Sequence, residues 1–108
     1  MEIIEQHTSP DGLLRFMVCR DAGDICLGFD GFPWHTHPDL LASDGVTEEA
    51  AVRQFVDGLL RGRALIAVAR VGEAVRDVWI THDVGSELKF KSKDETIEFR
   101  YWDGSKAA

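Results

Sequence analysis

The chain has 108 residues, 44% hydrophobic and 29% charged, which predicts one domain covering residues 1–108. Nineteen acidic side chains against twelve basic ones give a formal charge of −7, which argues against a nucleic-acid or anionic-membrane partner. No run of about 18 apolar residues occurs, and residues 1–6 lack the basic start of a signal peptide. We therefore expect a soluble, cytoplasmic protein.

Residues 13–20 and 25–30 are predicted to form the first hairpin. With Phe16 opposite Phe29, one face of the pair is apolar, and a slip by one residue would destroy this arrangement. A short strand over residues 3–7 is expected to precede it. The same register gives three further cross-strand pairs: Val18 with Leu27, Arg15 with Asp30, and Cys19 with Cys26.

The two cysteines of the chain, Cys19 and Cys26, therefore face each other in this register. Opposed residues in an antiparallel pair have Cα atoms about 4.5–5.5 Å apart, near the range that a disulfide tolerates. In a reducing cytoplasm we expect two free thiols, and a redox-switchable bond remains an alternative. We expect no zinc-ligand role for the pair, because His35 and His37 come well after the end of the predicted strand.

A single amphipathic helix is predicted between Thr47 and Gly62. Its apolar residues recur at the spacing of one helix face, Thr47 is suited to the N-cap, and Gly62 to the position after the last turn. Glu49 and Arg53 are expected to pair on the wet face. The apolar stripe consists of Val52, Phe55, Val56, Leu59 and Leu60.

Two more hairpins are predicted after the helix. The first joins residues 64–71 to residues 74–81 through Gly72 and Glu73, a type II′ turn, and is expected to lie centrally because both faces are apolar. Its expected faces are Ile66, Val68 and Trp79 on one side and Leu65, Ala67, Val78 and Ile80 on the other.

The last predicted hairpin joins residues 87–91 to residues 96–102. Apolar pairs fall on one face and opposite charges on the other. The expected pairs are Phe90 with Ile97, Leu88 with Phe99, Lys89 with Glu98, and Glu87 with Arg100. The element order becomes β-β-β-α-β-β-β-β, which predicts an α+β fold with a mainly antiparallel sheet and one helix packed on one face.

The segment most suggestive of chemistry is His35-Thr36-His37-Pro38, between the third strand and the helix. In an extended chain His35 and His37 project to the same side, where two imidazoles can reach one metal ion such as zinc. The third ligand is expected to be Asp39, or alternatively His82 or Asp83. A purely structural role for these side chains is the competing interpretation.

The same tetrapeptide resembles the His-x-His-Pro core of the JAMM-type zinc isopeptidases. In that family a Ser-x-x-Asp motif supplies the third zinc ligand, and an upstream glutamate activates the zinc-bound water. Here Asp44 directly follows Ser43, so that motif is absent, and the upstream glutamate would have to be Glu2 or Glu5. The resemblance covers four residues, and we do not assign the chain to the family.

Charge favours a protein-binding role instead. Residues 1–49 carry ten acidic side chains and two basic ones. Five of the acids flank Phe32 and Trp34, namely Asp21, Asp24, Asp30, Asp39 and Asp44. Aromatic anchors inside a charged rim are typical of interfaces, which predicts a basic protein partner or a homodimer. The composition is similar in kind to that of bacterial immunity proteins, which favours a non-enzymatic domain. Its predicted binding residues are Phe32, Trp34, His35, His37 and Asp39.

Overall fold

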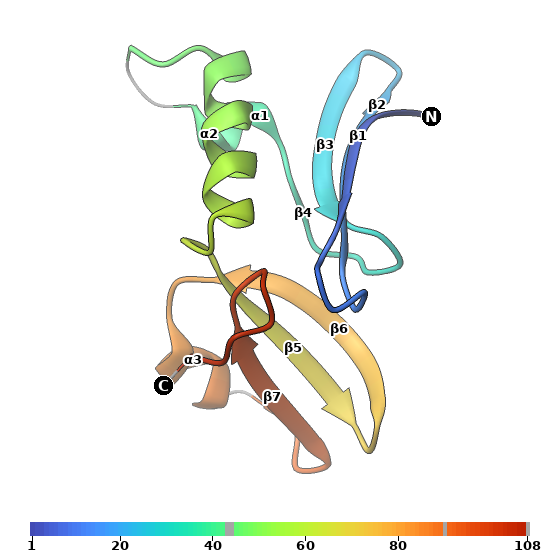
Figure 1. The fold of residues 1–108 in the computed structure, drawn as a ribbon, viewed down its shortest axis with the longest axis vertical. Helices are drawn as coiled ribbons and strands as arrows, with labels where there is room; N and C mark the ends of the chain where they lie inside the picture. Colours follow the sequence, from blue (N-terminus) through green and yellow to red (C-terminus); the bar gives the residue numbers. More distant parts are fainter. Residues whose placement is uncertain (43–44, 90, 108) are drawn as a thin grey trace.

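The computed structural model describes residues 1–42, 45–89 and 91–107, and in them two antiparallel sheets are accompanied by short helices (Figure 1). The α+β class and the antiparallel pairing are confirmed, whereas the strands form two sheets and not one. No described helix is long and apolar enough to cross a membrane. The elements in chain order are β1 (Glu2–Thr8), β2 (Arg15–Asp21), β3 (Asp24–Phe29), β4 (His35–Thr36), α1 (Pro38–Leu41), α2 (Glu48–Leu60), β5 (Leu65–Val71), β6 (Ala74–Thr81), α3 (Val84–Lys89) and β7 (Glu95–Arg100).

The first sheet has the order β1-β2-β3-β4, and its central hairpin has the predicted register. Phe16 opposes Phe29 with ring centroids 5.3 Å apart, and Arg15 lies 3.6 Å from Asp30. The turn is tight because Ala22 and Gly23 both have positive φ, 52° and 87°, as a type I′ turn requires. The opposition of Cys19 and Cys26 is confirmed as well.

The second sheet has the order β6-β5-β7, and its β5–β6 hairpin is confirmed. The expected division of its faces is wrong, because a bulge between Ala69 and Arg70 shifts the register by one residue. Ile66 therefore opposes Ile80, and both are buried in the core. A bulge inserts a residue without changing the apolar pattern, so alternation in the sequence did not reveal it.

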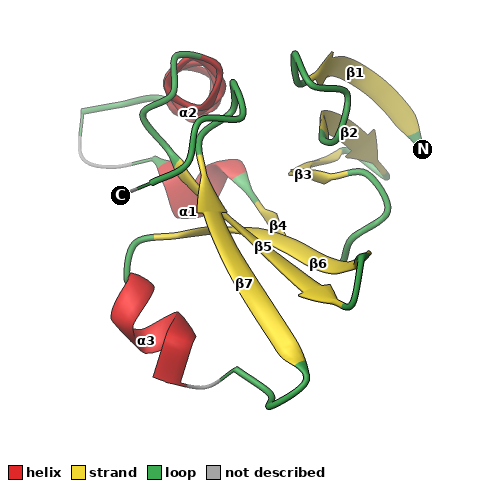
Figure 2. Ribbon diagram, turned by 60° about the horizontal axis from the view of Figure 1, so that its bottom comes forward, coloured by secondary structure: helices red, strands yellow, loops and turns green. Residues whose placement is uncertain are grey.

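The predicted hairpin between residues 87–91 and 96–102 is wrong. Residues 84–89 form α3, and β7 pairs instead with β5, the most deeply buried strand (Figure 2). This arrangement covers the second edge of β5, which a local hairpin would leave open. Asp83 fixes the start of α3, since its carboxylate accepts the Ser86 backbone N–H at 3.0 Å. The predicted partner Phe90 lies outside the described residues.

Helix α2 begins and ends as predicted. The Thr47 hydroxyl accepts the backbone N–H of Ala50 at 3.1 Å, and Gly62 has a φ of 76°. Its apolar face joins both sheets in one core, in which Val56 and Leu59 are completely buried. Arg53 reaches the Glu5 carboxylate of β1 at 3.1 Å, so the helix is also tied to the first sheet by charge.

One ion pair joins the two sheets directly. The Arg100 guanidinium on β7 donates to the Asp11 carboxylate, in the turn between β1 and β2, at 2.6 Å. The Arg100 side chain is 3% exposed, and that of Asp11 is 40% exposed. The hydrogen bonds from Arg100, and then from Ser9, hold the pKa of Asp11 well below the usual range of an aspartate. The ionised carboxylate is therefore strongly favoured in the folded state.

We expect Asp11→Asn to lower the free energy of unfolding by about 2 kcal/mol near neutral pH, because Arg100 is left buried without its counter-charge. The pKa of Asp11 is lowered on folding, so its contribution is fully present above the ordinary aspartate pKa of about 4 and is lost as the pH falls below it. Urea unfolding at neutral and acid pH measures both effects.

The control is Asp30→Asn, which removes an exposed ion pair with Arg15 at 3.6 Å. We expect it to cost less than about 0.5 kcal/mol. If Asp11→Asn unfolds with the wild-type free energy at neutral pH, the ion pair does not join the sheets in the way described.

Candidate functional site

The His35–Pro38 segment does not continue outward from β3 but folds back along it. The backbone N–H of Phe32 donates to the Phe29 carbonyl at 3.2 Å, and Gly31 has a φ of 87°, which closes a tight turn after β3. Strand β4 then runs antiparallel to β3, with His35 opposite Gly28. The expectation that the two histidines lie beyond the end of the strand is therefore wrong.

Glycine at position 28 permits this approach. A Cβ atom on Gly28 would lie 2.7 Å from the Trp34 carbonyl oxygen and 3.4 Å from the Cβ of His35. The first distance is too short for any side chain, and the obstructing atom is backbone. Gly28 thus acts as the strand glycine that marks close backbone contact. Any larger residue would push β4 away from β3.

The two faces of the first sheet divide the residues of β4 between core and surface. Thr36 opposes Leu27 on the inner face, where Thr36 is 8% exposed. His35 and His37 project to the other face, as predicted, and their ring centroids are 5.0 Å apart. Since side chains on β3 alternate in the same way, Cys26 shares this outer face with the two histidines.

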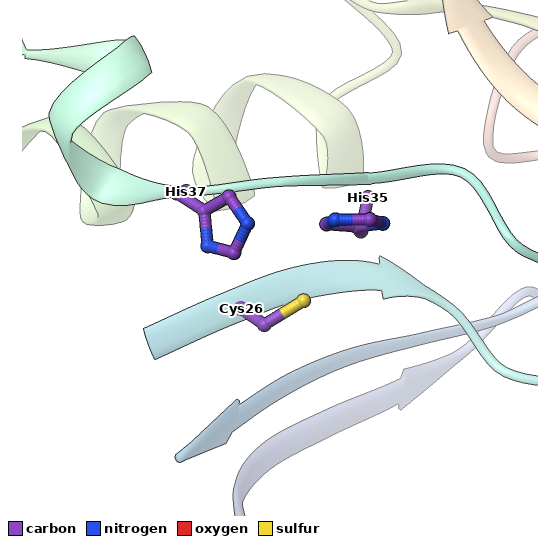
Figure 3. A group of neighbouring side chains, drawn as sticks. All are labelled: Cys26, His35 and His37. Carbon is purple, nitrogen blue, oxygen red and sulfur yellow. The ribbon is translucent and has the colours of Figure 1, made fainter. Parts of the chain in front are cut away.

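Cys26, His35 and His37 form a three-ligand cluster. One ligand atom from each residue lies within 4.8 Å of those of the other two. Figure 3 shows the thiol of Cys26 on β3 and the two imidazoles on the returning segment pointing into the same space. Cys26 and His37 are half-buried and His35 is exposed, so the cluster lies at the surface and an ion in solution can reach it.

Hydrogen bonds to backbone carbonyls orient both imidazoles. Nδ1 of His35 lies 2.9 Å from the Pro33 carbonyl oxygen, and Nδ1 of His37 lies 3.0 Å from the Ile25 carbonyl oxygen. A carbonyl can only accept, so each Nδ1 carries the proton and each neutral ring keeps the lone pair on Nε2. This is the outer-shell arrangement that orients histidines for metal binding.

The surroundings of Cys26 favour the neutral thiol over the thiolate. Burial raises its pKa, and the neighbouring Cys19 raises it further. Both cysteines are free thiols in the structure. A divalent cation between Cys26 and the two histidines would reverse this preference, because a metal-bound thiol is deprotonated.

The side chain that lies close to the two histidines is Cys26 and not Asp39. Asp39 lies exposed in the first turn of α1 and does not belong to the cluster. The alternatives His82 and Asp83 follow β6, outside the cluster, where Asp83 caps α3. Gly28, two residues after Cys26, is the one feature of the sequence that indicates a close approach of another strand to β3.

The aromatic residues predicted as exposed anchors are half-buried. Phe32 and Trp34 pack against the core, and the Trp34 ring lies 6.1 Å from that of Phe29. Their role in binding a partner stays a prediction, but their packing holds the turn that precedes β4. In the structure, Phe32 and Trp34 therefore help to position residues 35–38.

The glutamates that would match the isopeptidase pattern are held by arginines. Glu2 accepts from Arg20, and Glu5 from Arg53, each at 3.1 Å. The predicted Ser43-Asp44 match lies outside the described residues. In the part of the chain that the structure describes, neither glutamate is therefore left unpaired to activate a metal-bound water.

No protein-family model, curated protein or solved structure matches this chain.

We expect Gly28→Ala to lower the free energy of unfolding by about 1–3 kcal/mol and to weaken metal binding, because the added methyl displaces Trp34 and with it β4. Chemical denaturation and metal titration measure the two effects.

The matched control is Gly58→Ala, which adds the same methyl on α2, where nothing lies within 4 Å. This variant is expected to gain up to about 1 kcal/mol through its helix propensity and to bind metal normally. Equal stability of Gly28→Ala and wild type would show that β4 does not approach β3 as closely as described.

Proposed function

We propose that this protein binds one divalent transition-metal ion through Cys26, His35 and His37, with zinc as the best match. The observation that carries the proposal is the convergence of three ligand atoms within 4.8 Å of one another. The Nδ1 hydrogen bonds of both histidines support it, because they leave Nε2 free to bind an ion.

The donor set selects the class of metal. One thiolate sulfur and two imidazole nitrogens match the borderline-soft ligands that zinc prefers, whereas calcium and magnesium bind to oxygen. Three protein ligands leave a fourth tetrahedral position for water or a ligand from solution. Because His35 is exposed, that position is accessible from the surface. The proposal covers metal binding and does not include hydrolysis.

Protein binding, the function first expected from charge, stays a prediction. Several N-terminal acids form ion pairs, including Glu2, Glu5, Asp11 and Asp30, which reduces the acidic excess available to a basic partner. A groove of about 840 Å³ lies between the first sheet and the start of α2, but its lining mixes glutamates with Arg20 and Arg53. Neither feature favours a basic partner or a second copy of the chain over the metal site.

Untagged wild-type protein is expected to bind one zinc or cobalt(II) ion per chain. Removal of a ligand should weaken zinc binding in each of three variants, Cys26→Ala, His35→Ala and His37→Ala. The loss in affinity should exceed the roughly 10–100-fold that results when a residue hydrogen-bonded to a ligand is removed. Competition titration with a chromogenic chelator measures the affinities, and elemental analysis the stoichiometry.

Asp39→Asn and His82→Ala serve as controls, because both positions were candidate ligands and neither belongs to the cluster. Both should keep the wild-type affinity. A strong loss in Asp39→Asn with little change in Cys26→Ala would replace the proposed ligand set by the one expected from the sequence. Absence of stoichiometric binding in the wild type would refute the metal site itself.

A further inference from the structure

Cys26 has a second neighbour besides the histidines. On its β4 side it faces His35 and His37, and on its β2 side it lies directly opposite Cys19. An open depression of about 360 Å³ on the outer face of the first sheet is lined by Cys19, Cys26 and His35, among others. Cys19 does not belong to the three-ligand cluster, so it is a neighbour of the site and not one of its ligands.

The backbone holds the two cysteines at a distance that a disulfide can bridge. The Asp30 N–H donates to the Arg15 carbonyl at 2.9 Å, which makes these opposed residues a hydrogen-bonded pair. Such pairs alternate along an antiparallel ladder, so Cys19 and Cys26, four residues along, form another. Hydrogen-bonded pairs have Cα atoms about 5.5 Å apart, within the range of known disulfides.

The same geometry would strain the bond. The Cβ atoms of a directly opposed pair are about 4.5–5.5 Å apart, at the wide end in hydrogen-bonded pairs, whereas a relaxed disulfide has about 3.8 Å. Strained disulfides are more readily reduced and are the labile, regulatory ones. A bond between Cys19 and Cys26 would therefore need only a small local approach of β2 and β3 and would be easily reversed.

We propose that Cys26 alternates between a metal–thiolate bond and a disulfide with Cys19, so that a peroxide releases the metal ion and a dithiol restores the site. The inference rests on the proposed metal site. The two bonds exclude each other because a disulfide sulfur is no longer a thiolate, and only His35 and His37 then remain as protein ligands.

The exposure of the two thiols sets the order of events. Cys26 is half-buried and Cys19 is 9% exposed, so a peroxide reaches Cys26 first. The Cys26 sulfur attacks the peroxide, the O–O bond breaks, and a sulfenic acid forms with loss of hydroxide. Cys19 loses its proton, attacks this sulfur and displaces a second hydroxide, which takes up that proton as water.

The net change is the loss of two electrons from the two sulfurs to one hydrogen peroxide. One thiolate and one thiol give one disulfide, one water and one hydroxide, and the metal leaves as the divalent ion. Reduction by a dithiol transfers two electrons back, regenerates both thiols and forms the cyclic disulfide of the reductant.

The test uses the zinc-loaded full chain treated with hydrogen peroxide at one equivalent. Released zinc is followed with a chromogenic chelator, and the bond between Cys19 and Cys26 is followed by peptide mass mapping under non-reducing conditions. We expect zinc release and intramolecular disulfide to rise together, and dithiothreitol with added zinc to restore both thiols and the bound ion.

Cys19→Ala and Cys19→Ser keep the three ligands and serve as matched variants. Both should bind zinc with wild-type affinity. Neither can form the intramolecular disulfide, so excess peroxide should oxidise their Cys26 beyond the sulfenic acid, and dithiothreitol should then fail to restore zinc binding. The second substitution guards against a packing defect in the first.

Three results would overturn the inference. Weak zinc binding by both Cys19 variants would make Cys19 a ligand and not the redox partner. Full recovery of zinc binding by these variants with dithiothreitol after excess peroxide, as in the wild type, would show that Cys19 is not needed. Retention of zinc by a wild-type protein that carries the disulfide would show that the bonds do not exclude each other. Failure of zinc loading before peroxide is added would instead refute the proposed function.

Discussion

Glycine at position 28 allows β4, which carries His35, to lie against β3, which carries Cys26. Gly28 faces the Trp34 carbonyl at a distance where a Cβ atom would lie 2.7 Å from the oxygen, so β4 can lie against β3 only with glycine there. This approach places His35 and His37 over the outer face of β3, beside Cys26. It also brings the Ile25 carbonyl to Nδ1 of His37, so the pairing that gathers the ligands orients one of them as well.

The core and the proposed metal site occupy opposite faces of the same sheet. Phe16 and Leu27 are buried on the inner face, where they help to form the core beneath α2, and Thr36 is buried on the same face. Cys26 and the two histidines lie on the outer face, and none of these three residues belongs to the hydrophobic core cluster. The core therefore fixes the position of β3, and the outer face is left free to carry three polar ligands.

The sequence predicted most of the local structure. Cross-strand pairs of like character determined the register of the β2–β3 hairpin, and capping residues determined α2. Interactions distant in sequence were missed. The β7–β5 pairing depends on covering an apolar strand edge, and charge complementarity within residues 87–102 favoured a local hairpin instead. For the site, the pattern identified both histidines but not Cys26, because the return of β4 depends on a tight turn and on glycine in the facing strand.

The central claim is that one sulfur and two imidazole nitrogens of this chain bind the same ion. X-ray absorption spectroscopy at the zinc edge of the loaded wild-type protein tests it most directly. We expect one sulfur at about 2.3 Å and two imidazole nitrogens at about 2.0–2.1 Å, with one oxygen or nitrogen completing the shell. A first shell of oxygen and nitrogen without sulfur would contradict it.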